Sequence, residues 1–201
     1  MFRVLFRSTK LATAFAVAAT ALAATASASN APDARLDQLA TKVAGHPVSV
    51  WCESSWQDWV DVERLLPGSP DLYGFTIPTH SNVVYLQPTV CETLHVLLAN
   101  NYYDTGDYWT AIAIHTLVHE SLHQKGFADE GATDCAALAL DPSVDAQFVP
   151  ETYTSSKWVR MKKRLVRRKV TAANPDFARL VSWQHWFHNN AFPPEYRGGC
   201  S

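Results

Sequence analysis

The segment from residue 119 to 123 has the residue types and spacing of a metal site with a general base. It reads His-Glu-Ser-Leu-His, the H-E-x-x-H motif, near the end of a predicted helix. His119 and His123 lie one turn apart on the same helical face, so both imidazoles can reach one ion at about 2.0–2.1 Å. Glu120 is displaced round the helix and can bond a water beside the metal without being a ligand. The motif therefore predicts a zinc (Zn) site with Glu120 as the catalytic residue.

A catalytic zinc ion also needs a third protein ligand and an open position for water. The adjacent acids Asp129 and Glu130, which follow the motif, are the candidates for this third ligand. Glu130 and Asp134 form E-x-x-x-D on the following predicted helix, where Glu130 would bind zinc and Asp134 would support His119 as a second-shell hydrogen-bond partner. Asp129 completes the pattern H-E-x-x-H-x-x-G-x-x-D and is the alternative third ligand.

We favour Glu130 because Asp129 occupies the N-cap of the next predicted helix, where its side chain binds backbone N–H groups. The Asp129 frame also goes with a methionine turn beneath the metal. Met161 is the only methionine after the motif, and it lies in a highly charged segment. Six residues separate His123 from Glu130, so the connecting turn must be sharp, and Gly126 allows this.

The residues from 108 to 140 resemble the gluzincin class of zinc metallopeptidases, especially its small one-domain members. The G-x-x-D-E turn, the cysteine on the glutamate helix and the Pro-Pro-Glu-Tyr-Arg tail are also similar to small exported actinobacterial zincin-like proteins of unassigned role. The resemblance implies hydrolysis of a peptide or protein substrate by zinc-activated water, with Glu120 as general base. The alternative is a non-enzymatic exported zinc-containing binding protein with a structural or vestigial H-E-x-x-H site. Such a site would not need Glu120, so its presence favours the enzyme.

Other polar residues have competing interpretations. His115 precedes His119 by one turn. It could line the site or hold a carboxylate, but we expect it to pack beside the metal helix without a role. The candidates for stabilising an oxyanion are His185, His188 and Tyr196, although aromatic-rich segments such as theirs usually form core. Residues 82–86 form a predicted strand, either the edge strand that zincins use to bind substrate backbone or an ordinary core strand.

The first 28 residues have the pattern of a secretory signal peptide. Three basic residues precede an uncharged alanine-rich run that ends in Ala26-Ser27-Ala28. We therefore expect a secreted, extracellular protein of one domain over residues 29–201, with no stable membrane insertion, and a monomer. Four cysteines exported to an oxidising compartment predict two disulfides. Three pairings are open, and our preference is Cys52–Cys91 with Cys135–Cys200.

With 47% hydrophobic and 18% charged residues among 201, the composition is that of a globular protein and excludes a disordered or collagen-like chain. Periodicity and turn residues predict helices at 32–44, 88–100, 108–125, 130–140, 157–170 and 175–187, and strands at 47–52, 75–78 and 82–86. Residues 53–74 are expected to be irregular or weakly helical. The expected fold is α+β, a minimal zincin-like domain in which a small sheet packs on the active-site helix and the glutamate helix, with a mostly helical C-terminal part.

Basic residues are concentrated in one segment. Residues 29–201 contain 14 basic and 19 acidic residues, and eight of the 14 lie between 157 and 169. Trp158, Met161 and Leu165 recur there at helical spacing, which predicts an amphipathic basic helix at 157–170. It would either attract an anionic polymer, such as teichoic acid, membrane headgroups or nucleic acid, or form a solvated surface.

Overall fold

The computed structural model describes residues 33–64, 73–77, 82–100, 107–162, 164–191 and 200. Its fold is α+β, as expected. The helices are α1 (Ala34–Ala44), α2 (Trp56–Glu63), α3 (Pro88–Asn100), α4 (Tyr108–Gln124), α5 (Glu130–Phe148) and α6 (Pro175–Ala191). The strands are β1 (Ser49–Cys52), β2 (Gly74–Thr76), β3 (Val83–Leu86), β4 (Thr152–Met161) and β5 (Arg164–Ala173). The predicted signal peptide lies outside the described residues.

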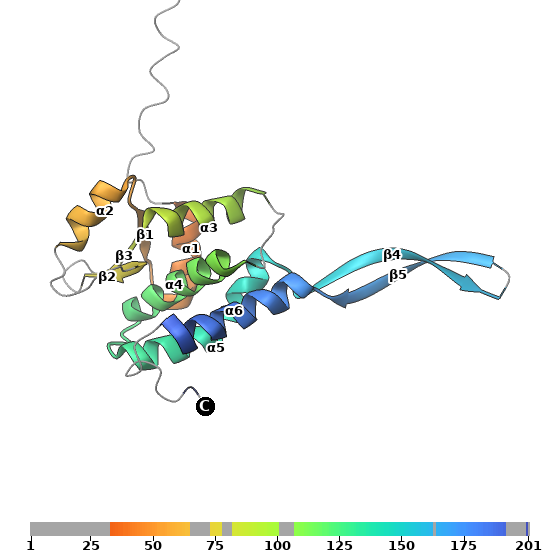
Figure 1. Cartoon of the computed structure of the whole chain (residues 1–201). Helices are drawn as coiled ribbons and strands as arrows, with labels where there is room; N and C mark the ends of the chain where they lie inside the picture. Colours follow the sequence, from red (N-terminus) through yellow and green to blue (C-terminus); the bar gives the residue numbers. More distant parts are fainter. Residues whose placement is uncertain are drawn as a thin grey trace, which may run out of the picture.

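Helix α4, which carries the H-E-x-x-H motif, is the centre of the core. Every residue from Thr110 to Leu122 is buried. The helix contacts α1, α3, α5, α6, β2 and β3 (Figure 1). Because its neighbours surround it, α4 has apolar residues on most faces rather than one stripe, as is typical of a buried helix. The few polar groups on α4 are therefore held in a rigid, water-poor environment.

Local signals determine where α4 begins and ends. Asp107 caps its N-terminus by accepting a hydrogen bond from the Thr110 N–H at 2.7 Å. After the helix, Gly126 adopts φ +104°, a left-handed conformation that residues other than glycine rarely adopt. The Phe127 N–H then donates to the Leu122 carbonyl at 3.2 Å. This turn brings the start of α5 back towards the end of α4.

The three-stranded sheet has the order β1-β3-β2. Strand β3 pairs parallel to β1 and antiparallel to β2. Residues 82–86 therefore supply the central strand, so their proposed role as an edge strand is wrong. Strand β2 is an edge strand of this sheet and contacts α4.

Helix α5 is longer than predicted, because it continues through Pro142 to Phe148. A proline inside a helix removes one backbone hydrogen bond and costs about 3 kcal/mol. Buried residues on both sides of it, Asp141, Val144 and Asp145, show what offsets that cost. Packing of α5 against α4 and α6 overrides the local stop signal.

The predicted basic helix at 157–170 is wrong. This segment forms the antiparallel strands β4 and β5, with Lys162 at φ +56° in the turn between them. In a helix, basic residues would face one another four positions apart, as Arg160 would face Arg164, and such like-charge pairs destabilise helices. The valines and Trp158 also favour strands.

Both disulfides join the cysteines that sequence analysis preferred. Cys52 pairs with Cys91, and their Cα atoms are 5.7 Å apart; Cys135 pairs with Cys200 at 5.1 Å. The first links the end of β1 to the first turn of α3, and the second fastens the C-terminal segment to α5. Disulfides are typical of oxidising compartments. Among the described helices, none is both long and apolar enough to cross a membrane.

Candidate metal centre

Three donor atoms from α4 and the start of α5 converge at one point. Nε2 of His119 lies 3.1 Å from Nε2 of His123 and 3.0 Å from Oε2 of Glu130. The His123 nitrogen lies 3.3 Å from the same oxygen. The structure thus brings together the three residues that sequence analysis named as ligands.

The triangle has dimensions that suit a tetrahedral metal ion. Ligand atoms arranged tetrahedrally at about 2.0–2.1 Å from zinc lie about 3.3 Å from one another. The observed separations are 3.0, 3.1 and 3.3 Å. Two ring nitrogens and a carboxylate oxygen so close together need a shared proton or cation between their lone pairs. This group can therefore hold a metal ion.

Hydrogen bonding orients the His123 ring. Its Nδ1 lies 2.7 Å from the carbonyl oxygen of Phe127. A carbonyl can only accept, so Nδ1 carries the proton, and the Nε2 lone pair of the neutral ring points into the triangle. Such an outer hydrogen bond is the usual device that fixes the tautomer of a ligating histidine. The turn at Gly126 places Phe127 for this contact.

Glu130, and not Asp129, reaches the two histidines. The Asp129 side chain accepts a hydrogen bond from the Ala132 N–H at 2.8 Å and caps α5. Glu130 is the first residue of α5, and its side chain is 45% exposed. The triangle therefore opens to solvent on the Glu130 side while His119 is buried in α4.

Charges at the triangle favour a cation at its centre. Two hydrogen bonds, the larger contribution from His119 and the next from His123, hold the pKa of Glu130 well below its ordinary value. Burial alone would lower the pKa of His123, but its contact with Glu130 and the charge of Glu120 raise that pKa overall. The carboxylates thus stabilise positive charge on His123, and they would equally stabilise a metal ion.

Glu120 stands beside this group. It is buried, and burial is the main cause that raises its pKa above the ordinary glutamate value. The charges of His119 and His123 oppose the rise, while Glu130 adds to it. Glu120 follows His119 directly on α4. A buried carboxylate with a raised pKa is suited to accepting and returning a proton near neutral pH.

Strand β2 lies directly against Glu120 at Gly74. A Cβ atom built on Gly74 would be 3.0 Å from Cγ of Glu120 and 2.8 Å from Cγ2 of Thr116. Both separations are shorter than ordinary carbon contacts. Glycine is therefore required for this close approach of the strand backbone to the helix.

Asp134 does not support His119 in the expected way. Its Oδ1 lies 3.8 Å from Nδ1 of His119, beyond hydrogen-bonding distance, and 2.7 Å from Nε2 of His115. Its Oδ2 contacts Nδ1 of His188 on α6. The predicted hydrogen bond from the His119 ring to the Asp134 carboxylate is therefore wrong. Asp134 connects α5 to histidines of α4 and α6.

A buried polar network extends from this contact. Nδ1 of His115 lies 2.6 Å from Oδ2 of Asp141, so the imidazole is held between two carboxylates of α5. Further along α5, Asp145 accepts a hydrogen bond from the Gln184 amide at 2.9 Å. All four side chains are almost completely inaccessible. The network joins the three helices α4, α5 and α6 by polar contacts inside the core.

Sequence reasoning favoured packing without a role for His115 over holding a carboxylate, whereas the structure gives it two carboxylate partners. A signal was available, because Asp134, Asp141 and Asp145 recur on one face of α5 and fall among buried residues. Acids on a buried face require cationic or hydrogen-bonding partners. His115, His119 and Asp134 also form a second group of possible metal ligands within 4.8 Å of one another. The hydrogen bond between His115 and Asp134 already occupies two of its donor atoms.

The candidates for stabilising an oxyanion separate in the structure. His188 is buried in the polar network, and its Nε2 lies 3.5 Å from Sγ of the disulfide-bonded Cys200. His185 is exposed on α6. Tyr196 lies outside the described residues.

In comparisons with protein-family models, curated proteins and solved structures, nothing matches this chain.

Proposed function

We propose that this chain is a zinc-dependent metallopeptidase that hydrolyses peptide bonds, with His119, His123 and Glu130 as metal ligands. The observation that carries the proposal is the convergence of two imidazole nitrogens and a carboxylate oxygen within 3.0–3.3 Å of one another. Two histidines and one glutamate are the protein ligands of one group of catalytic zinc sites. Four of the residues that a gluzincin-like site needs, the three ligands and Glu120, thus lie together.

Exposure supports a catalytic rather than a structural centre. Structural zinc sites are closed by four protein ligands, whereas catalytic sites keep one position open. Here three donor residues converge, and the Glu130 side chain is 45% exposed. A substrate would therefore approach the metal from the side of Glu130.

Glu120 is the proposed general base. When bound, zinc would act as a Lewis acid towards a carbonyl group and towards water. The Glu120 carboxylate would take the proton from the attacking water and return it to the leaving amine. Its buried position raises its pKa, so it holds a transferred proton more readily than an exposed glutamate would.

Strand β2 supports a peptide as substrate. It is an edge strand of the sheet and lies against Glu120 at Gly74. An extended peptide could add to such an edge through backbone hydrogen bonds, which recognise any sequence. The scissile bond would then lie beside Glu120.

The test is a comparison of wild type with Glu120→Gln, which keeps the side-chain shape and removes the base. Both proteins should contain one zinc ion per chain. On a mixed peptide library at neutral pH, Glu120→Gln should cleave about 10²–10⁴-fold more slowly. Equal cleavage by the two proteins would show that the activity does not come from this site. A lack of stoichiometric zinc in the wild type would overturn the metal assignment itself.

A further inference from the structure

The strands β4 and β5 form a two-stranded ribbon that projects from the body of the molecule (Figure 1). We call residues 152–162 and 164–173 the basic ribbon. No acidic residue occurs between positions 152 and 173 of the sequence. The described basic residues of the ribbon are Lys157, Arg160, Lys162, Arg164, Arg167, Arg168 and Lys169. This arm therefore has a strong positive charge without internal compensation.

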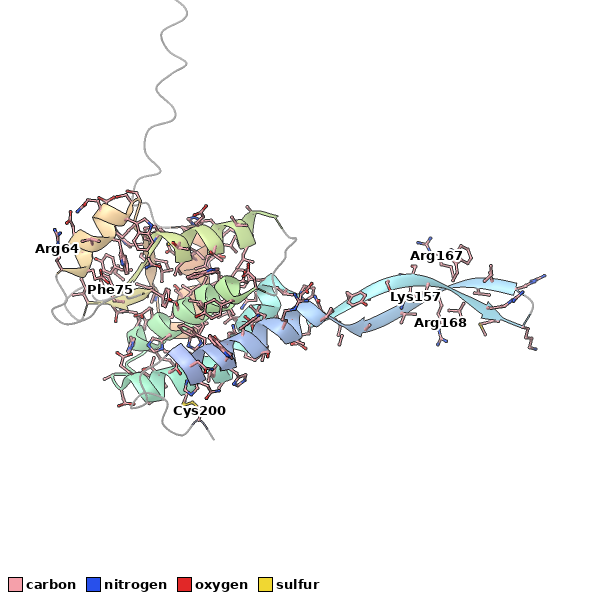
Figure 2. All side chains as sticks on the ribbon, viewed as in Figure 1. Arg64, Phe75, Lys157, Arg167, Arg168 and Cys200 are labelled. Atoms are coloured by element: carbon pink, nitrogen blue, oxygen red, sulfur yellow. A yellow bond between two sulfur atoms is a disulfide. The ribbon has the colours of Figure 1, made fainter. Side chains whose placement is uncertain are left out.

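Positive charge lies on both faces of the ribbon. Residues opposite one another in an antiparallel pair project to the same face, and successive residues alternate between faces. Lys157 is opposite Arg168 on one face, and Trp158 is opposite Arg167 on the other. Figure 2 shows Arg167 and Arg168 pointing to opposite sides. Like charges directly opposite one another destabilise a strand pair, so the ribbon would gain from an anionic partner.

The end of the ribbon near its turn also exposes large apolar side chains. Trp158 is 69% exposed, Leu165 66% and Met161 56%. Val159 and Val166, which pair with each other, are exposed as well. A two-stranded hairpin without a covered apolar face is marginally stable in water. The exposed apolar side chains and the uncompensated charges thus occur on the same paired segments of β4 and β5.

We propose that the basic ribbon adsorbs to an anionic phospholipid membrane surface. Lipid phosphates complement the lysines and arginines, and the boundary between headgroups and acyl chains accepts Trp158 and Leu165, which project to the same face of the ribbon. A nucleic acid or a wall polymer would match the charges but offers no apolar phase for the aliphatic side chains. The guanidinium and ammonium groups on both faces make burial in hydrocarbon costly, so contact stays at headgroup level.

The charge of the remaining chain restricts this attraction to the ribbon. Outside residues 152–173, residues 29–201 contain six basic and 19 acidic residues. An anionic surface therefore repels the body while it attracts the arm. The projecting shape lets the arm reach a membrane without bringing the body against it (Figure 1). This inference is independent of the proposed peptidase activity.

The experiment is co-sedimentation of the full-length protein with vesicles of phosphatidylcholine alone or mixed with phosphatidylglycerol, with duplex DNA as a third ligand at the same salt concentration. We expect binding to the mixed vesicles and little to the neutral ones. The triple variant Arg164→Gln, Arg167→Gln, Arg168→Gln should bind the mixed vesicles about 100-fold more weakly. A matched control changes three exposed basic residues elsewhere, Lys42→Gln, Arg64→Gln and Arg179→Gln, and should bind like wild type.

A second variant separates lipid from other polyanions. Trp158→Ser with Leu165→Ser keeps every charge and should weaken vesicle binding by at least about tenfold, because apolar burial scales with buried area. Its affinity for DNA should not change. The proposal is overturned if mixed vesicles do not bind, if the control loses as much affinity as the ribbon variant, or if this double variant binds vesicles like wild type. Unchanged zinc content and circular dichroism of all variants would verify that the body is folded.

Discussion

Oδ1 of Asp134 lies 2.7 Å from Nε2 of His115, one helical turn before His119. The same carboxylate contacts His188 through its other oxygen. Asp134 is completely buried, and its two carboxylate oxygens contact two imidazoles that are not proposed metal ligands. Its main contribution is therefore expected to be the joining of α4, α5 and α6.

The variant Asp134→Asn tests this role. Removal of one partner from a buried charged contact typically costs about 3–5 kcal/mol. We expect a loss of this order in the free energy of unfolding, measured by denaturant titration of the zinc-free protein. Zinc affinity of the folded variant should change by less than about tenfold. A larger loss of zinc affinity with unchanged stability would show that Asp134 acts on His119 after all.

The choice between the two neighbouring acids is tested by a pair of single substitutions. Glu130→Gln removes a proposed ligand, so zinc affinity should fall by more than the roughly 10–100-fold that loss of a supporting hydrogen bond costs. Asp129→Asn should keep zinc and stability, because asparagine caps helices as well as aspartate does. Competitive titration with a chromogenic chelator measures both affinities. The ligand assignment fails if Asp129→Asn is the variant that loses zinc.

Asp145 should make stability depend on pH. Burial, followed by the neighbouring Asp141 charge, raises the pKa of Asp145 to about 8, although its hydrogen bond from Gln184 acts in the opposite direction. Between about pH 4 and pH 8 the folded protein holds this proton and the unfolded chain does not. Raising the pH through this window therefore removes stability, by up to about 6 kcal/mol.

The variant Asp145→Asn isolates this contribution, because asparagine stays neutral and can still accept the Gln184 hydrogen bond. In a chelating buffer, the free energy of unfolding of wild type minus that of Asp145→Asn should decrease from pH 4.5 to pH 8.5, which are about the limits of the window. A difference that is constant with pH would mean that Asp145 titrates normally in the folded protein.

Gly74 should be intolerant of a side chain. A Cβ atom there would be 2.8 Å from Cγ2 of Thr116 and 3.0 Å from Cγ of Glu120. Gly74→Ala is expected to cost about 1–3 kcal/mol of stability through overpacking, and to slow peptide hydrolysis by displacing Glu120. The double variant with Thr116→Ser removes the nearest methyl group and should restore part of the stability. If Gly74→Ala behaves like wild type, β2 is not held against the helix as closely as the structure shows.

The sequence alone predicts which side chains face one another within one helix or across one turn. The spacing of His119 and His123 on α4, the glycine turn and the cap at Asp129 together indicated that Glu130 would face the histidines. Helix geometry and capping depend on residues only a few positions apart, so the chain itself carries that information. The cysteine pairing was a preference among three alternatives, and the structure shows the preferred pairs, Cys52–Cys91 and Cys135–Cys200.

Relations between distant segments were decided only by the tertiary structure. Which histidine meets Asp134 depends on how α5 and α6 are rotated against α4, and no local pattern specifies that rotation. The position of β3 in the middle of its sheet depends on pairing with both β1 and β2. Residues 152–173 have helical spacing of Trp158, Met161 and Leu165, yet form a ribbon. Repulsion between basic residues four positions apart disfavours the helix, and the turn at Lys162 places Arg160 and Arg164 on opposite strands.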